Sequence, residues 1–88
     1  MRPDVAQFHY DKGRVLRALG RSKEALTAYD EAIRLNPNSA LFYTRKGDVL
    51  RDLKRSGEAL AAYEQALQID PDLEDAIKGK RLAEKPKP

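Results

Sequence analysis

The amino-acid sequence predicts an all-α protein in which antiparallel helical hairpins stack side by side. Three observations lead to this fold class. The sequence repeats with a period of 34 residues, its apolar residues recur at helical spacing, and small residues recur where helices would cross. A chain of 88 residues suits one small domain and is too short for a multidomain enzyme.

The 34-residue period runs through most of the chain. Pro3, Pro37 and Pro71 carry it through three steps, and Gly13 recurs as Gly47. About half of the unit is identical in both copies, and the identical small and aromatic pairs include Ala6 and Ala40, Ala25 and Ala59, Tyr29 and Tyr63, and Ala32 and Ala66. A period of this length is typical of helix–turn–helix repeats.

Each unit is predicted to contain two helices, because its apolar residues follow a helical period. The first helices are expected over 4–19 and 39–53. Their apolar stripes are Phe8, Val15, Leu16 and Leu19, and then Phe42, Val49, Leu50 and Leu53. The second helices are expected over 22–35 and 56–69. Their stripes are Ala25, Leu26, Tyr29, Ala32 and Ile33, and then Ala59, Leu60, Tyr63, Ala66 and Leu67.

A fifth helix is expected over 73–84. It is similar to the start of a third unit, but Arg81 replaces the expected glycine, so it is predicted to be a solvating cap. Polar residues suited to cap helix N-termini stand before the predicted helices: Ser22, Ser56, Asn38 or Ser39, and Asp72.

Glycine in the middle of a helix costs about 1 kcal/mol relative to alanine. Its recurrence at Gly13 and Gly47 therefore predicts a close helix crossing that has no room for a side chain, with Tyr29 filling the wider gap beside it.

These elements predict a single domain over residues 1–84. Repeat one covers about 6–39, repeat two about 40–73, and the capping helix about 73–84. The basic, proline-broken residues 85–88 are expected to form a disordered tail.

The residues at the repeated positions resemble the signature of tetratricopeptide (TPR) repeats: Gly13, Leu16, Ala25, Tyr29, Ala32 and Pro37, and then Gly47, Leu50, Ala59, Tyr63, Ala66 and Pro71. His9 and Tyr43 depart from it, because they stand where the family often places tryptophan. The resemblance implies a right-handed solenoid whose first helices line a concave groove. It also implies a scaffold that binds peptides or helices and has no chemistry of its own.

Catalytic, cofactor and metal sites are not expected, and neither is enzyme activity. The chain has no cysteine and one histidine, and its scattered glycines lack phosphate-loop spacing. The N-terminus has no apolar stretch of the kind that export or membrane anchoring needs, so a cytoplasmic location is expected.

The resemblance places eight residues on the concave face: Gln7, Tyr10, Arg14, Arg17, Leu41, Thr44, Asp48 and Arg51. The first helices carry a net positive charge and the second helices a net negative one, so the groove is predicted to be basic. A basic groove favours an acidic peptide or a chain-terminal carboxylate as the ligand. The alternative, in which these arginines only solvate an exposed layer, has equal weight.

The usual TPR clamp for chaperone carboxylate tails is not expected here. By resemblance, that clamp uses a Lys and an Asn in the first repeat, an Asn in the second, and a Lys and an Arg in the third. This sequence holds Tyr10, Arg14, Arg45, Asp75 and Gly79 there, and Asp75 would repel a carboxylate.

Two other functions stay open. Only two full repeats are present, whereas such solenoids generally need about three for stability, so a self-assembling module excised from a longer array is one alternative. Nucleic-acid binding is disfavoured, because Asp and Glu alternate with the basic residues and no nucleic-acid motif is recognised.

Overall fold

The computed structural model describes residues 3–84, and the predicted tail over 85–88 lies outside them. The described elements are all helices: α1 (Pro3–Ala18), α2 (Ser22–Leu35), α3 (Ala40–Asp52), α4 (Ser56–Ile69) and α5 (Glu74–Glu84). The all-α fold class and the predicted order of five helices are confirmed. None of these helices is long and apolar enough to cross a lipid bilayer.

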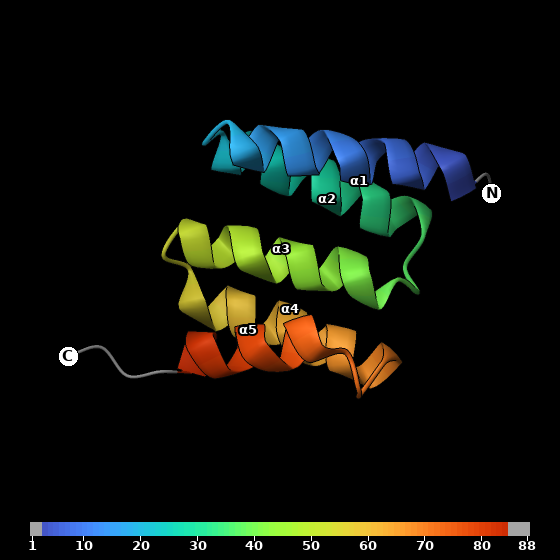
Figure 1. Cartoon of the computed structure of the whole chain (residues 1–88). Helices are drawn as coiled ribbons and strands as arrows, with labels where there is room; N and C mark the ends of the chain where they lie inside the picture. Colours follow the sequence, from blue (N-terminus) through green and yellow to red (C-terminus); the bar gives the residue numbers. More distant parts are fainter. Residues whose placement is uncertain (1–2, 85–88) are drawn as a thin grey trace.

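The helices form two hairpins and a final single helix (Figure 1). Helix α1 packs on α2, and α3 packs on α4. The hairpins meet chiefly through α2 and α3, and α5 lies mainly on α4 with a smaller contact to α3. One face of α3 is therefore covered by the hairpin that precedes it.

Two tyrosines set the spacing within the hairpins. Tyr29 and Tyr63 are the largest fully buried side chains, at 1% and 0% exposed. A Cβ atom added to Gly13 would lie 2.6 Å from Cε1 of Tyr29, and one added to Gly47 would lie 2.7 Å from Cε1 of Tyr63. Both distances are far inside van der Waals contact, so the predicted need for glycine at these crossings is confirmed.

Helix α5 contributes a glycine that the repeat pattern did not reveal. A Cβ atom on Gly79 would lie 2.2 Å from Cε1 of Tyr63, so this ring is enclosed by Gly47 on one side and Gly79 on the other. Arg81, which occupies the repeated glycine position, is exposed instead. The cap helix thus meets the preceding tyrosine at a different position along its length.

The predicted caps at Ser22 and Ser56 are wrong. Both residues lie inside their helices, and the N-cap positions are Arg21 and Arg55, neither of which makes a side-chain cap hydrogen bond. The arginine side chains instead bind the carboxylate three residues ahead, as in the 2.7 Å pair of Arg21 with Glu24. Ser39 does cap α3, because its Oγ accepts a hydrogen bond from the backbone N–H of Phe42 at 3.3 Å.

The apolar stripe of the first helix does not pack as its counterpart in repeat two does. Phe8, Val15 and Leu19 are 64%, 59% and 64% exposed, whereas Phe42 and Val49 are 5% and 0% exposed. The reason is position in the stack. Helix α2 covers α3 on this side, whereas no element among residues 3–84 covers the same side of α1.

The crossing at Gly47 predicts a large effect of substitution. Gly47→Leu should overpack the contact with Tyr63 and lower the free energy of unfolding by about 1–3 kcal/mol. A change of 1 kcal/mol moves Tm by about 4–8 °C in a domain of this size, so thermal unfolding followed by circular dichroism resolves the effect.

The matched control is Gly57→Leu, because an added Cβ at Gly57 has no heavy atom within 4 Å. It should leave Tm nearly unchanged. Equal melting temperatures for the Gly47 variant and the parent would contradict the close crossing.

Candidate functional site

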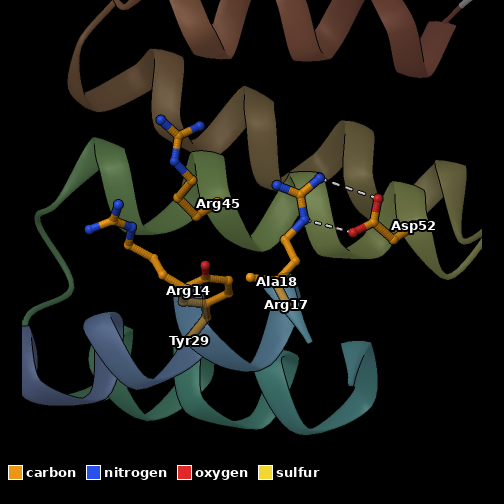
Figure 2. A pocket seen from close by; sticks show the side chains of 6 residues that line it. All are labelled: Arg14, Arg17, Ala18, Tyr29, Arg45 and Asp52. Atoms are coloured by element: carbon orange, nitrogen blue, oxygen red, sulfur yellow. Dashed lines mark hydrogen bonds and ion pairs between the residues drawn. The ribbon is translucent and has the colours of Figure 1, made fainter. Parts of the chain in front are cut away.

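A hollow of about 340 Å³ opens between the two hairpins and is named here the arginine hollow (Figure 2). Its lining comes from α1, α2 and α3: Arg14, Arg17, Ala18, Tyr29, Arg45 and Asp52. Three guanidinium groups thus share this space with one carboxylate, and the balance of charge favours an anion.

Arg17 is already engaged within the protein. Its Nε donates to Oδ2 of Asp52 at 2.6 Å, and a second guanidinium nitrogen donates to Oδ1 at 3.3 Å. The hydrogen bond with Asp52 raises the pKa of Arg17. This two-point contact joins α1 to α3, so Arg17 helps to hold the hairpins together as well as lining the hollow.

Arg45 bridges α3 and α5. One guanidinium nitrogen donates to Oδ2 of Asp48 at 2.9 Å, and the other donates to Oδ2 of Asp75 at 2.7 Å. Burial of the Arg45 guanidinium disfavours its charged form and lowers its pKa. The hydrogen bonds outweigh this effect, so the pKa of Arg45 is raised overall. The bond from Arg45 also lowers the pKa of the Asp75 carboxyl.

Arg14 differs from the other two arginines. Its side chain is exposed, and its guanidinium carbon lies 6.0 Å from the centre of the Tyr10 ring. Within residues 3–84 no carboxylate forms an ion pair with it, so Arg14 is the guanidinium of the hollow that keeps its full donor set for a ligand.

The hydroxyl group of Tyr29 also reaches the arginine hollow, and Figure 2 shows it pointing into the space between Arg14 and Arg17. Burial is the main cause that raises the pKa of Tyr29 to about 12. The hydroxyl is therefore protonated at neutral pH and can donate a hydrogen bond. Sequence reasoning assigned Tyr29 only a packing role, and nothing in the repeat pattern showed where its polar end would emerge.

Asp48 is the centre of an internal network. Tyr63 Oη donates to Oδ1 of Asp48 at 2.5 Å, and Arg51 Nε donates to Tyr63 Oη at 2.9 Å. Burial and the bond to Asp48 raise the pKa of Tyr63. Asp48 is only 7% exposed, so the carboxylate of this predicted groove residue accepts hydrogen bonds from other side chains of the protein.

The other predicted groove residues divide by exposure. Thr44 is fully buried, and its hydroxyl donates to the carbonyl oxygen of Ala40 at 2.8 Å. Tyr10 is 5% exposed, and its ring stacks on Phe42 with the ring centres 4.9 Å apart. Gln7 and Leu41 are exposed, and Gln7 donates to Asp11 at 3.0 Å.

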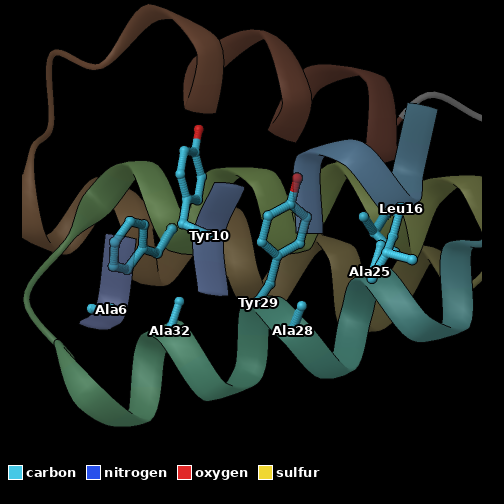
Figure 3. Close-up of a cluster of buried hydrophobic side chains, with 9 residues drawn as sticks. Ala6, Tyr10, Leu16, Ala25, Ala28, Tyr29 and Ala32 are labelled. Carbon is cyan, nitrogen blue, oxygen red and sulfur yellow. The ribbon is translucent and has the colours of Figure 1, made fainter. Parts of the chain in front are cut away.

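Two of the eight predicted groove residues, Arg14 and Arg17, line the arginine hollow. Tyr10 belongs to the first core cluster beside Tyr29, with ring centres 5.7 Å apart (Figure 3). Within residues 3–84, no three His, Cys, Asp or Glu side chains gather in a way that could hold a metal ion.

Residues 2–74 match the profile of the tetratricopeptide repeat family. The chain belongs to the tetratricopeptide repeat family. Five of the six residues that line the arginine hollow come from α1 and α3, the first helices of the two repeats. TPR chains are protein-interaction scaffolds. A search of the curated proteins found no significant match.

Solved TPR domains share this fold. The second TPR of Spaghetti (RPAP3), bound to the HSP90 peptide SRMEEVD, superposes with a TM-score of 0.87 at 20% identity, over 89% of this chain and 72% of that one. The first TPR of Spaghetti, bound to the same peptide, superposes with a TM-score of 0.91 at 18% identity, over 94% of this chain and 68% of that one. The TPR2B domain of yeast Sti1, in a complex with pHsp70, gives 0.87 at 27% identity, over 89% and 62%.

The hydrogen-bond network at Asp48 predicts that removing one oxygen atom, the Tyr63 hydroxyl, lowers the stability of the fold. Tyr63→Phe removes the hydroxyl that donates to Asp48 and accepts from Arg51, and it leaves a buried carboxylate short of a donor. The expected loss is about 1–3 kcal/mol in the free energy of unfolding, measured by urea denaturation.

Tyr43→Phe is the matched control, because the Tyr43 hydroxyl forms no hydrogen bond among the described residues. It should change stability little. Equal losses for the two variants would mean that the network adds nothing.

Proposed function

We propose that this TPR chain binds an acidic, extended or helical segment of another protein in the arginine hollow. The observation that carries the proposal is Arg14, an exposed guanidinium with no carboxylate partner within residues 3–84, beside the protonated Tyr29 hydroxyl. Guanidinium groups hold carboxylates through paired N–H donors. A Glu or Asp side chain that reaches the hollow would meet both donors.

The affinity is expected to be modest. Arg17 and Arg45 already share their charge with Asp52, Asp48 and Asp75, so they attract a ligand less than free arginines would. Two repeats also present a small surface, of the size typical of weak and transient complexes. An affinity no tighter than micromolar follows from both arguments.

The two TPR domains of Spaghetti are bound to an HSP90 peptide, and the TPR2B domain of Sti1 is in a complex with pHsp70, which supports a peptide as the ligand class. The clamp positions here argue against a terminal carboxylate, however. Asp75 is held beside Arg45, and Gly79 is buried against Tyr63 and offers no donor. We therefore propose an internal acidic segment as the ligand.

Self-assembly is the alternative that the sequence leaves open. Its surface would have to be one that the stack leaves uncovered, and the exposed side of α1 is the main apolar one. Sedimentation up to millimolar concentration distinguishes a monomer from a dimer.

Charge reversal at Arg14 tests the proposed site. An acetylated and amidated peptide of alternating Glu and Leu should bind the parent chain, and Arg14→Glu should weaken it about ten-fold, as expected for loss of a charged hydrogen bond. Raising the ionic strength from about 0.01 to 1 M shortens the Debye length from about 30 to 3 Å and should also weaken binding. Fluorescence anisotropy measures both effects.

Lys23→Glu is the control, since it makes the same charge change on the exposed side of α2. If Arg14→Glu folds normally and binds the peptide as tightly as the parent and the control do, the arginine hollow is not the site.

The terminal carboxylate is tested separately with the peptide SRMEEVD. Its free-acid and C-terminally amidated forms should bind with affinities that agree within about two-fold, because Asp75 stands where the clamp needs a cation. Isothermal titration calorimetry compares the two forms. A loss of ten-fold or more on amidation would show a working carboxylate clamp.

A further inference from the structure

A second surface lies on the side of α1 that no described element covers. It is named here the α1 face and consists of residues that recur three or four positions apart: Val5, Phe8, Lys12, Val15 and Leu19. The four apolar members are 37–64% exposed. The α1 residues of the arginine hollow are Arg14, Arg17 and Ala18. Because an α-helix has 3.6 residues per turn, these positions point to a different side of α1 from the α1 face.

The protein itself shows what covers such a face. In repeat two, Phe42 and Val49 occupy the positions of Phe8 and Val15, and they belong to the core cluster of the first hairpin. Helix α2 supplies Leu26 and Ile33 to that cluster. Helix α2, together with the Tyr10 ring of α1, therefore covers on α3 the face that stays exposed on α1.

Lysines recur along the chain at the position of Lys12, and the later ones form ion pairs. Lys46 of α3 pairs with Asp30 of α2 at 2.9 Å, and Lys80 of α5 pairs with Glu64 of α4 at 3.9 Å. Both lysines thus meet a carboxylate on the preceding helix. Lys12 stands 34 residues before Lys46, and no carboxylate within residues 3–84 forms an ion pair with it.

We infer that the α1 face binds an acidic amphipathic helix of another polypeptide, packed along α1 as α2 packs along α3. The expected pattern is Leu, an acidic residue four positions later, and Ile or Leu three positions after that. Helix α2 has it as Leu26, Asp30 and Ile33, and α4 has it as Leu60, Glu64 and Leu67. The leucine and isoleucine would cover the apolar residues of the α1 face, and the acid would pair with Lys12.

A second copy of this chain fits less well. Its two helices with the pattern are already packed within its own stack, where α3 and α5 cover them. An antiparallel contact between two α1 faces would pair Phe8 with Val15 and Val5 with Leu19, and its centre would then lie at Lys12. Two like charges would meet there, which disfavours the contact.

The α2 sequence itself serves as the probe. An acetylated, amidated peptide of residues 22–35 is titrated into the ¹⁵N-labelled chain, and amide shifts are followed. Because an isolated helix of this length is marginal in water, binding has to order the peptide and should be weak, in the range of about 0.1–1 mM. Saturable shifts should map to the α1 face, at residues 5–19.

Charge exchange then tests the pairing of Lys12. Lys12→Glu in the chain, or Asp30→Lys in the peptide, should each weaken binding about two- to five-fold, and the two changes together should restore it. Phe8→Gln should abolish measurable binding, because it removes the largest exposed apolar group of the face. Lys23→Glu in the chain is the control and should leave the affinity unchanged. Phe8 and Lys12 are exposed, so these variants should keep the parent Tm.

Several results would overturn the inference. These are the absence of saturable shifts, shifts confined to the α2–α3 interface, and exchanged charges that fail to restore binding. Dimerisation of the unliganded chain through α1, seen by sedimentation and by concentration-dependent shifts, would assign the face to a second copy. Arg14→Glu should leave this peptide's binding unchanged, so failure here and failure of the arginine hollow are separate results.

Discussion

The packing of a buried tyrosine ring against a helix that has no side chain at the contact determines the rest of this structure. Tyr29 lies against Gly13, and Tyr63 lies between Gly47 and Gly79, at distances that leave no room for a Cβ atom. The rings therefore fix how closely the helices approach. They also carry their hydroxyl groups across the hairpin to the surface of the first helices, so the contact that sets the packing also places a donor in the candidate site.

The two tyrosines end in different environments because one repeated position differs. Asp48 accepts a hydrogen bond from the Tyr63 hydroxyl, and Arg45 and Arg51 also contact its carboxylate. The residue 34 positions earlier is Arg14, which cannot accept a hydrogen bond. The Tyr29 hydroxyl consequently stays available in an open, basic hollow. A single exchange of acid for base within the repeat thus distinguishes the internal network at Asp48 from the candidate binding site at Arg14.

The sequence predicted the features that depend on local residues and on the period: the five helices, the hairpins and the glycines at Gly13 and Gly47. It did not predict features that depend on neighbours in the stack. Phe8 and Phe42 occupy equivalent positions in the two repeats, yet only Phe42 has a helix packed over it. The pair of Arg17 with Asp52 crosses between hairpins, so no spacing along one helix indicates it. Gly79 lies outside the repeat register, and a search by period misses it.

The two candidate surfaces follow from the same physical cause, a repeated position whose usual partner is absent within residues 3–84. Lys46 and Lys80 each have a carboxylate on the preceding helix, and Lys12 has none. Arg14 stands where repeat two has Asp48, and it has no acid to pair with. Ion pairs such as Lys46 with Asp30 and Lys80 with Glu64 join neighbouring helices of the stack. We therefore propose that a cation left without such a repeated partner marks the side on which another molecule packs. Both unmatched cations lie on α1, on different faces, so the two proposed ligands would contact this helix without competing with each other.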